Sequence, residues 1–295
     1  MSKIKSTNGY KIFTFFNTIL MIILVLITVY PIYYCLVASF SDSAKLTLNA
    51  GKLLLVPLKP YNTEAYRRVF QHPLFLSGWR NTVIILIIGT LINMFMTIIS
   101  GYPLAQKNMM LNRPISLFII FTMYFSGGLI PNYLNVRDFG MTNTLWSLII
   151  PGAMSVYNLI IMRTAFASIP DSLIESAQLD GARHFTILYR VALPLVKPTL
   201  AVLVLYYAVG HWNSWFAASI YLQDTELFPL QLVMQRLLDS ANVDMLSGVD
   251  AADQANFVEL IKYALIVVST VPILLIYPFL QKYFVNGVML GAVKG

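Results

Sequence analysis

The sequence predicts an all-α polytopic membrane protein with six transmembrane helices. Hydrophobic residues make up 58% of its 295 residues and charged residues only 11%, which is about half the charge of a soluble domain. Six long stretches carry no Asp, Glu, Lys or Arg, and the shortest has 19 residues. That length lets a helix cross the hydrocarbon core, which is roughly 30 Å thick. None of the six alternates with the period of two that is typical of membrane β-strands.

The six stretches define approximate spans. The first follows Lys3, Lys5 and Lys11 but is too long for the apolar core of a secretion signal, so we expect an uncleaved anchor. Residues 1–11 then form an N-terminal segment, 12–284 the transmembrane domain and 285–295 a tail. The expected spans are 12–41, 81–106, 114–136, 139–162, 198–223 and 263–281.

Two segments between the spans are expected to lie on the outer side. Residues 41–78 are expected to be structured, with a short helical pattern from Thr63 to Phe70. Residues 224–257 are rich in acidic side chains and match no calcium-loop spacing. We expect that second segment to be a solvated loop that faces water or a partner.

The charge distribution predicts that both termini lie in the cytoplasm. With six spans both ends share one side. If that side is the cytoplasm, its segments hold eleven Lys and Arg against three acidic residues, and the outer segments hold nine basic and ten acidic residues. This is the positive-inside bias. Six of the outer basic residues lie between positions 41 and 80, in a loop long enough to influence orientation only weakly.

The predicted spans contain no carboxylate and no permanent cation. Proton- or sodium-coupled carriers usually need an ionisable group within a span. His211 is the one titratable candidate apart from tyrosines, and a lone His is more often a hydrogen-bonded structural residue. Backbone carbonyls could still bind sodium, so a coupled carrier is disfavoured without being excluded.

Motifs for catalysis and for metal binding are absent from the sequence. It has no phosphate-binding loop, so the chain does not hydrolyse ATP by the usual route. His72, His184 and His211 lie in different segments, Cys35 is alone, and no nucleophile elbow occurs. The basic residues behind the net charge of +7 are scattered. We therefore expect no enzyme, no metal site and no nucleic-acid partner.

The most informative stretch is the predicted cytoplasmic segment 169–194. Ser172 and Glu175 have the spacing of a capping box, which predicts that a short helix begins there. Gly181 suits the left-handed position that ends such a helix.

A second short helix is expected to follow, with Phe185, Leu188 and Val191 on its apolar face. Pro194 is expected to break the chain before the fifth span. By physical pattern alone, this helix–Gly–helix unit could equally be an amphipathic hairpin that rests on the lipid headgroups.

Three pieces of this segment resemble the EAA signature of ABC importer permeases, which reads E-A-A-x-x-x-G and then, after about nine residues, I-x-L-P. They are Glu175-Ser-Ala, Asp180-Gly-Ala and Val191-Ala-Leu-Pro, with Ser176 and Val191 as mild departures from Ala and Ile. The wider resemblance covers nearly the whole chain. It includes the six spans, Ser126–Pro131, Gly210–Trp215 and the ending Val285–Lys294.

The chain is thus similar to the MalG-like carbohydrate permeases of binding-protein-dependent transport systems, nearest to the YtcP/LplC-like subgroup linked to complex oligosaccharides. The resemblance implies the type I ABC importer permease fold in a bacterial cytoplasmic membrane. It also implies a second permease subunit, two ABC ATPase subunits, and an extracytoplasmic solute-binding protein that delivers an oligosaccharide. No cofactor is expected on this chain, since ATP and Mg would bind to the ATPase subunits.

The same resemblance assigns ATPase coupling to the loop 167–197. Its first helix would sit in a cleft of the ATPase and convert closure of that subunit into opening of the pathway. The tail from Asn286 to Gly295 is a further candidate contact. The predicted coupling residues are Glu175, Ser176, Ala177, Asp180, Gly181, Ala182, Arg183, Leu193 and Pro194.

Aromatic faces and uncharged hydrogen-bonding groups are the side chains that bind sugars. Trp and Tyr near helix ends also form the interfacial belt, so both roles stay open for the aromatic candidates. Arg163, at the inner end of the fourth span, is expected to be a snorkelling anchor or an ion-pair partner. The predicted substrate-pathway residues are Tyr124, Asn158, Tyr206, Trp212, Asn213 and Trp215.

The predicted function is therefore one permease subunit of an ATP-driven oligosaccharide importer. The alternative is a self-sufficient secondary carrier or channel for a small polar solute. The residues leave open which oligosaccharide is carried and whether it is acidic or neutral.

Overall fold

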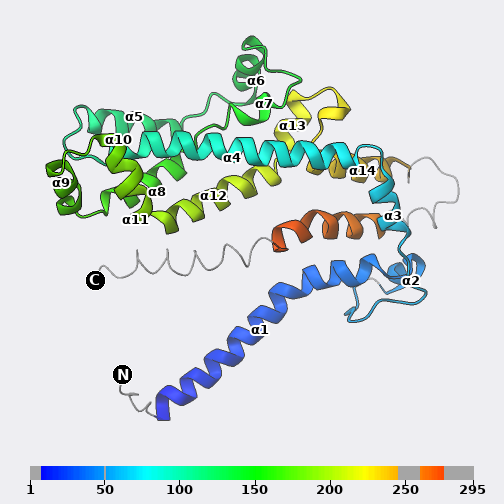
Figure 1. Cartoon of the computed structure of the whole chain (residues 1–295). Coiled ribbons are helices and arrows are strands. Elements are labelled where there is room, and N and C mark those ends of the chain that lie inside the picture. Colours follow the sequence, from blue (N-terminus) through cyan, green and yellow to red (C-terminus); the bar gives the residue numbers. More distant parts are fainter. Residues whose placement is uncertain (1–7, 50, 245–259, 276–295) are drawn as a thin grey trace. The chain divides into compact units, whose positions relative to one another are not determined.

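The computed structural model describes residues 8–49, 51–244 and 260–275, and the regular structure in these ranges is entirely helical (Figure 1). The chain divides into two compact units. One is drawn from residues 1–72 and 237–271, the other from residues 73–236 and 272–295.

The first unit is built around α1 (Asn8–Ser39), which is apolar on every side. Its most apolar window has a mean hydropathy of 2.6, and the described residues of the first unit do not bury it. Thr14, Thr18 and Thr28 donate their hydroxyl hydrogens to carbonyls one turn earlier, which satisfies these groups without water. An exposed surface of this kind is stable only in lipid or against another apolar surface.

Only the end of α1 is packed within the first unit. Two short helices, α2 (Ser43–Leu48) and α3 (Glu64–Gln71), lie in the same unit, as does the start of a further helix, Leu260–Leu275. The helix expected from Thr63 to Phe70 is thereby confirmed as α3. The buried cluster consists of Val37, Ala38, Leu46, Leu54, Ala65, Leu260 and Ala264.

The second unit is organised by α4 (Phe75–Ala105), against which α8 (Val156–Ala167) and α12 (Lys197–Trp212) pack (Figure 1). Side chains four residues apart share one face of a helix. On α4 one such row is buried along its whole length, and we call it the α4 seam. Its members are Asn81, Ile85, Gly89, Asn93, Thr97 and Gly101.

The polar members of the α4 seam all have partners within the second unit. Asn81 donates through Nδ2 to the carbonyl of Glu226 at 2.7 Å, and Asn93 donates to the carbonyl of Gly152 at 2.6 Å. Thr97 Oγ1 lies 2.7 Å from the hydroxyl of Tyr207 on α12. In a lipid-facing bundle these bonds fix helix positions, because an unsatisfied polar group there is costly.

His211 on α12 joins the same network. Its Nε2 lies 2.7 Å from Asn93 Oδ1, so the expectation of a hydrogen-bonded structural His is confirmed. The ring fits because Gly89 has no side chain: a methyl group on Gly89 would lie 2.5 Å from His211 Nε2. Small residues play this role wherever membrane helices approach closely.

The predicted spans and the helices agree in part. α1 and α4 are each long and apolar enough to cross a membrane, and the described residues give up to four crossings if each of two bent helix pairs counts as one. The first pair is α5 (Asn112–Tyr124) with α6 (Leu129–Asp138), bent by 112° within the stretch 114–136. The second pair is His184–Leu195 with α12, bent by 84°.

Two other charge-free stretches are interrupted as well. The stretch 139–162 holds α7 (Trp146–Ile149) and the start of α8, and 198–223 holds most of α12 and then α13 (Phe216–Tyr221). The breaks lie at Pro151-Gly152 and at Asn213-Ser214. These residues are uncharged, so a search for stretches without charged residues does not detect them. Part of the sixth predicted span, 263–281, lies outside the described residues.

The acidic segment 224–257 differs from the solvated loop that we expected. After a short turn, η2 (Thr225–Leu227), it forms α14 (Leu230–Asp244). Leu230, Leu232 and Val233 are fully buried, and Leu230 N–H donates to Thr82 Oγ1 on α4 at 2.8 Å. The segment is therefore partly core, because its apolar residues recur at helical spacing between the acidic ones.

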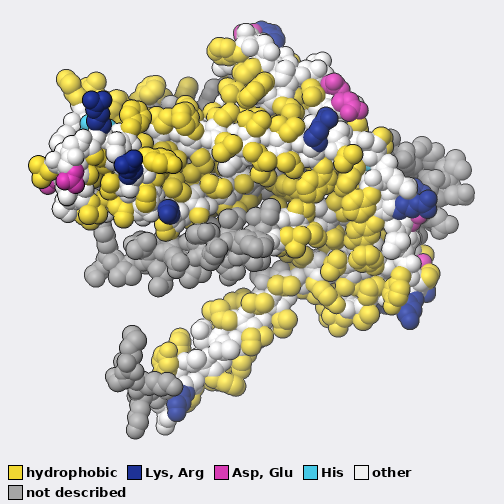
Figure 2. Space-filling model, in the orientation of Figure 1, with side chains coloured by type: hydrophobic (Ala, Val, Ile, Leu, Met, Phe, Trp, Pro, Cys, Tyr) yellow, Lys and Arg dark blue, Asp and Glu magenta, His cyan; other side chains and the backbone are white. Residues whose placement is uncertain are grey.

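The space-filling view agrees with a membrane environment. Figure 2 shows hydrophobic side chains over most of the surface along α4 and its neighbours, with Lys, Arg, Asp and Glu gathered toward the ends. A surface of this kind matches the low charge content of the sequence.

We expect Gly89→Ala to destabilise the protein, because the added methyl group displaces His211 and breaks its bond to Asn93. Gly210→Ala, one residue from His211, meets no atom within 4 Å and is the matched control. Both changes raise helix propensity by a similar amount. The difference between the unfolding free energies of the two variants therefore measures the effect of the clash with His211, and it should be about 1–3 kcal/mol. Thermal unfolding in detergent measures it. Equal melting temperatures for the two variants would contradict the role given to Gly89.

Candidate functional site

The candidate site is the helix α9 (Asp171–Leu179) together with the turn that follows it. The capping box expected at Ser172 is wrong. The helix begins one residue earlier, after Pro170, and no side chain caps it. Asp171 occupies the first turn, where a carboxylate interacts favourably with the helix dipole, but its side chain is engaged by Lys107 instead of the helix backbone.

The end of α9 is a Schellman motif, as Gly181 predicts. Gly181 has a φ of +79°. Ala182 N–H donates to the carbonyl of Ala177 at 3.0 Å, and Gly181 N–H donates to that of Gln178 at 2.9 Å. This pair of bonds defines the motif and needs a left-handed residue at Gly181.

The second helical segment is less regular than expected. It runs through α10 (His184–Ile187), a wide π-helical turn (Leu188–Ala192) and α11 (Leu193–Leu195). A proline ring clashes with the carbonyl four residues earlier in a regular α-helix, and the wide turn lies just before Pro194. The direction of the chain then changes at Val196, between Pro194 and Pro198.

The side chains that face inward differ in part from those expected. The buried residues are Ile187, Leu188 and Ala192, whereas Phe185 is 81% exposed. Of the expected apolar face, Leu188 and Val191 pack on the core, whereas Phe185 lines a groove together with Leu188 and stays largely exposed. Phe185 lies in α10, before the π turn, so its exposure follows from the side of α10 that faces the core, which is the side of Ile187.

The inner face of the site packs on the second unit's own core. We call this the α8–α12 cluster; it includes Tyr102, Phe166, Ile169, Ile187 and Leu203. Half-buried side chains of the α9 region lie against it: Ile174, Ala177, Ala182, Val191 and Leu193.

The outer face of the site is exposed to solvent. Of the predicted coupling residues, the exposed ones are Glu175, Ser176, Asp180, Gly181, Arg183 and Pro194. Three large apolar side chains stand beside them: Leu179 (89% exposed), Phe185 (81%) and Tyr189 (76%). Such side chains, gathered on one small unit, are typical of a protein–protein contact. Sequence reasoning missed them, since nothing local distinguishes an outward apolar residue from an inward one.

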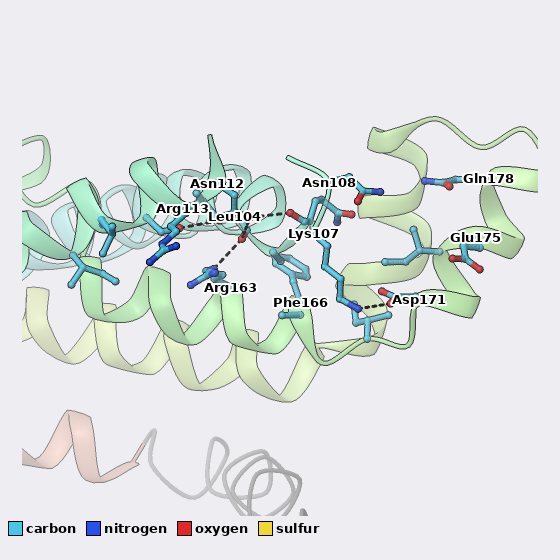
Figure 3. Close-up of a pocket in the computed structure, with 18 residues that line it drawn as sticks. Leu104, Lys107, Asn108, Asn112, Arg113, Arg163, Phe166, Asp171, Glu175 and Gln178 are labelled. Atoms are coloured by element: carbon cyan, nitrogen blue, oxygen red, sulfur yellow. Dashed lines mark hydrogen bonds and ion pairs between the residues drawn. The ribbon is translucent and has the colours of Figure 1, made fainter. Parts of the chain in front are cut away.

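A cleft of about 800 Å³ lies beside α9, bounded by α5, α8 and the loop after α4 (Figure 3). Lys107 Nζ forms an ion pair with Asp171 at 2.5 Å. The hydrogen bond and the charge of Asp171, with a further contribution from Glu175, raise the pKa of Lys107 above its ordinary value. The pair is exposed, so it contributes little to stability but joins the loop to the start of α9.

Arg163 and Asn112 close the other end of this cleft. Arg163 Nε donates to the carbonyl of Leu104 at 2.9 Å. Asn112 Nδ2 donates to the carbonyls of Leu104 and Gln106. The last turn of α4 is thus bound to both α5 and α8, and Arg163 has a backbone partner rather than an acidic one.

The predicted pathway residues do not share one environment. Asn158 and Trp212 are buried, and Trp212 packs edge-to-face on Trp79 with ring centroids 5.5 Å apart. Tyr206 and Trp215 are partly exposed, and Tyr124 at the end of α5 is exposed. Asn213 donates through Nδ2 to the carbonyl of Val209 at 3.0 Å, so its amide finds a partner in its own helix.

Among residues 8–49, 51–244 and 260–275, no group of three His, Cys, Asp or Glu side chains is arranged to hold a metal ion. The predicted contact of the tail from Asn286 to Gly295 lies outside the described residues.

Comparison with known proteins identifies the class. Residues 75–290 match the family of binding-protein-dependent transport system inner membrane components, and the chain belongs to this family. It is therefore a membrane component of a transport system and not an enzyme.

Individual relatives share most of their length with the chain. It is 38% identical to protein LplC of Bacillus subtilis, over 91% of this chain and 90% of that protein. It is 36% identical to the polygalacturonan/rhamnogalacturonan transport system permease protein YtcP of the same organism, over 92% and 94%.

A solved structure has the same fold. It is a bacterial ABC transporter involved in the import of the acidic polysaccharide alginate. The matched chain has a TM-score of 0.80 and 31% sequence identity, with 96% of this chain and 100% of that chain covered.

The φ of Gly181 gives a test of the turn. A Cβ at this position meets no atom within 4 Å, so the cost of substitution is conformational and not steric. Gly181→Ala should destabilise the turn by about 1 kcal/mol, whereas Gly181→Asn should be milder, because Asn tolerates the left-handed region. Hydrogen exchange of the Gly181–Ala182 region should be faster in the Ala variant than in the Asn variant. The reverse order would rule out this explanation.

Proposed function

We propose that the chain is the transmembrane permease subunit of an ATP-driven, binding-protein-dependent importer of oligosaccharides. The family membership and the names of the relatives support this proposal. The observation that carries it is the two-faced segment from α9 through α11, residues 171–195, which we call the α9 unit. It packs on the core through Ile174 and Ala177 and exposes a polar and aromatic surface outward.

We propose six membrane crossings with both termini in the cytoplasm. The charge-free stretches and the positive-inside bias support this topology. In it, a bent or interrupted stretch counts as one crossing, and irregular backbone at membrane depth is covered by protein. The α9 unit then faces the cytoplasm.

Coupling in this proposal begins when two ABC ATPase subunits, which bind ATP and Mg, close on each other while one of them holds α9 in a cleft. Glu175, Asp180 and Arg183 supply polar contacts, and Leu179 and Phe185 supply apolar anchors. Ser176, Gly181 and Pro194 lie on the same exposed surface, and Tyr189 adds a further aromatic group.

Movement of α9 would reach the spans through its inner face. Ala177, Ala182 and Leu193 pack against the α8–α12 cluster, which includes residues of α4, α8 and α12. Close-packed interiors transmit displacement because they compress little. We therefore assign these three small or apolar residues to the joint between α9 and the core, not to direct contact with the ATPase.

The translocation path would form between this chain and a second permease subunit, with an extracytoplasmic binding protein delivering the sugar. All six pathway candidates are uncharged. Aromatic stacking by Trp215 or Tyr206 and hydrogen bonds from Asn213 recognise hydroxyl-rich rings. The relatives named for transport of polygalacturonan and rhamnogalacturonan, and for import of alginate, favour an oligosaccharide released from a complex polysaccharide.

The importer is tested with the two permeases, the ATPase and the binding protein reconstituted in liposomes. Oligosaccharide uptake should require both ATP and the binding protein. Glu175→Arg should reduce substrate-stimulated ATP hydrolysis at least about fivefold, because reversal of a contact charge costs on the order of 1–3 kcal/mol. Glu226→Arg, an exposed Glu beyond the opposite end of α4, is the control. Uptake without ATP or the ATPase would instead indicate a secondary carrier or channel.

The apolar anchors are tested by Phe185→Ala. We expect this change to weaken association of the ATPase with the permease pair by about tenfold or more, because buried aromatic anchors contribute about 1–2 kcal/mol or more to an interface. Phe139→Ala, with a Phe that is 79% exposed at the end of α6, is the matched control. Association is measured by titrating ATPase onto the permease pair in nanodiscs. Equal affinity for the two variants would remove Phe185 from the contact.

A further inference from the structure

The cleft beside α9 has polar and apolar walls that belong to one continuous space. We call it the α5–α9 cleft. Its polar wall includes Lys107, Arg113 and Arg163, and its apolar wall includes Leu117, Ile120 and Phe166. Its volume of about 800 Å³ is large enough for a small organic ligand or part of a larger amphiphile.

Two of the three cations are available to an anion. Lys107 is neutralised by Asp171, but among the described residues neither Arg113 nor Arg163 forms an ion pair with a carboxylate. Arg163 uses Nε for the carbonyl of Leu104, which orients its guanidinium group and leaves the terminal nitrogens to donate. Figure 3 shows Arg113 and Arg163 toward one end of the cleft and the Lys107–Asp171 pair toward the other.

The acidic side chains of the cleft lie away from the arginines. Asp171 and Glu175 both belong to α9, at the end that Lys107 occupies (Figure 3). The arginine end is completed by Asn112 and Ser116 on α5, whose donors are engaged within the chain: Asn112 Nδ2 donates to the carbonyls of Leu104 and Gln106, and Ser116 Oγ donates to Asn112 Oδ1. The hydrogen bonds to an anion therefore come from the two guanidinium groups, whose planar sets of donors suit the oxygens of a phosphate.

The apolar wall runs along a helix that continues into an apolar surface. Leu117 and Ile120 follow Arg113 by one and two turns on α5. Phe118 and Phe121 on the same helix are exposed. A ligand that fits must therefore carry a phosphate at one end and hydrocarbon at the other. A free anion would leave the apolar wall unused.

We propose that the α5–α9 cleft binds an anionic phospholipid of the cytoplasmic leaflet, with its phosphate between Arg113 and Arg163 and an acyl chain along Leu117 and Ile120. The inference rests on the proposed function in one respect: the topology proposed there places the cleft at the cytoplasmic leaflet. A bound lipid would join α5 and α8 next to α9, so lipid composition would affect the stiffness of the joint that carries α9.

Native mass spectrometry of the complete transporter tests the site, because it counts bound lipids without needing transport. The probes are phosphatidylglycerol and phosphatidylcholine with identical acyl chains. The wild type should retain phosphatidylglycerol more tightly. Arg113→Gln should weaken this binding about fivefold, because the loss of one cation near the lipid phosphate costs about 1 kcal/mol of binding free energy. The double change with Arg163→Gln should weaken it further.

Controls separate the cleft from general surface charge. Lys197→Gln removes an exposed cation at the start of α12 and should leave binding unchanged, and Arg113→Lys should retain most of it. Equal binding of the two lipids, or equal losses in the Arg113→Gln and Lys197→Gln variants, would overturn the proposal. Displacement of the lipid by millimolar inorganic phosphate would also overturn it, since that result indicates a site for a soluble anion.

The outcome does not depend on transport. A transporter that hydrolyses no ATP can still be scored for bound lipid, and an active transporter with no preferred lipid at this cleft disproves only the lipid site. Arg113 is exposed, so the melting temperature of Arg113→Gln in phosphatidylcholine should equal that of the wild type.

Discussion

The second unit depends on one requirement: polar groups in apolar surroundings must find partners within the chain. The α4 seam meets it with Asn93 bonded to His211 and to Gly152, and with Thr97 bonded to Tyr207. Each bond fixes α4 against α12 or against the turn before α8. Gly89 and Gly101 allow the close approach that these bonds need. Once these three helices are placed, the cluster on which α9 rests is defined.

The position of the α9 unit is determined by that arrangement of helices and by two local features of its backbone. The Schellman turn at Gly181 returns the chain, and the wide turn before Pro194 leads it into α12. Because Ile174 and Ala177 face the core while Phe185 and Glu175 face outward, one short unit touches both the spans and the surroundings. This two-sided contact is the physical basis of the proposed coupling. The lipid proposed for the neighbouring cleft would act on the same joint.

The comparisons with known proteins and the burial of side chains establish different properties of the protein. The family match over residues 75–290 and the likeness to an alginate importer chain establish the class of the protein and its fold. They do not indicate which side chains of α9 face outward. That information comes from burial, which shows Ala177, Ala182 and Leu193 packed against the core and is the basis for the proposal that they belong to the inner joint.

The sequence by itself determined what depends on composition and on single residues. The low charge marked a membrane protein, the charge-free stretches located the apolar segments, Gly181 marked the end of α9, and the EAA-like residues indicated the family. Tertiary structure decided what depends on neighbours. The breaks inside three stretches, the π turn before Pro194, the exposure of Phe185, the buried start of α14 and the pairing of His211 with Asn93 were not predicted. A sequence pattern treats a hydrophobic residue in the same way whether its side chain is buried or exposed. Which of the two it becomes depends on the helices that pack against it, and those are defined only in the folded chain.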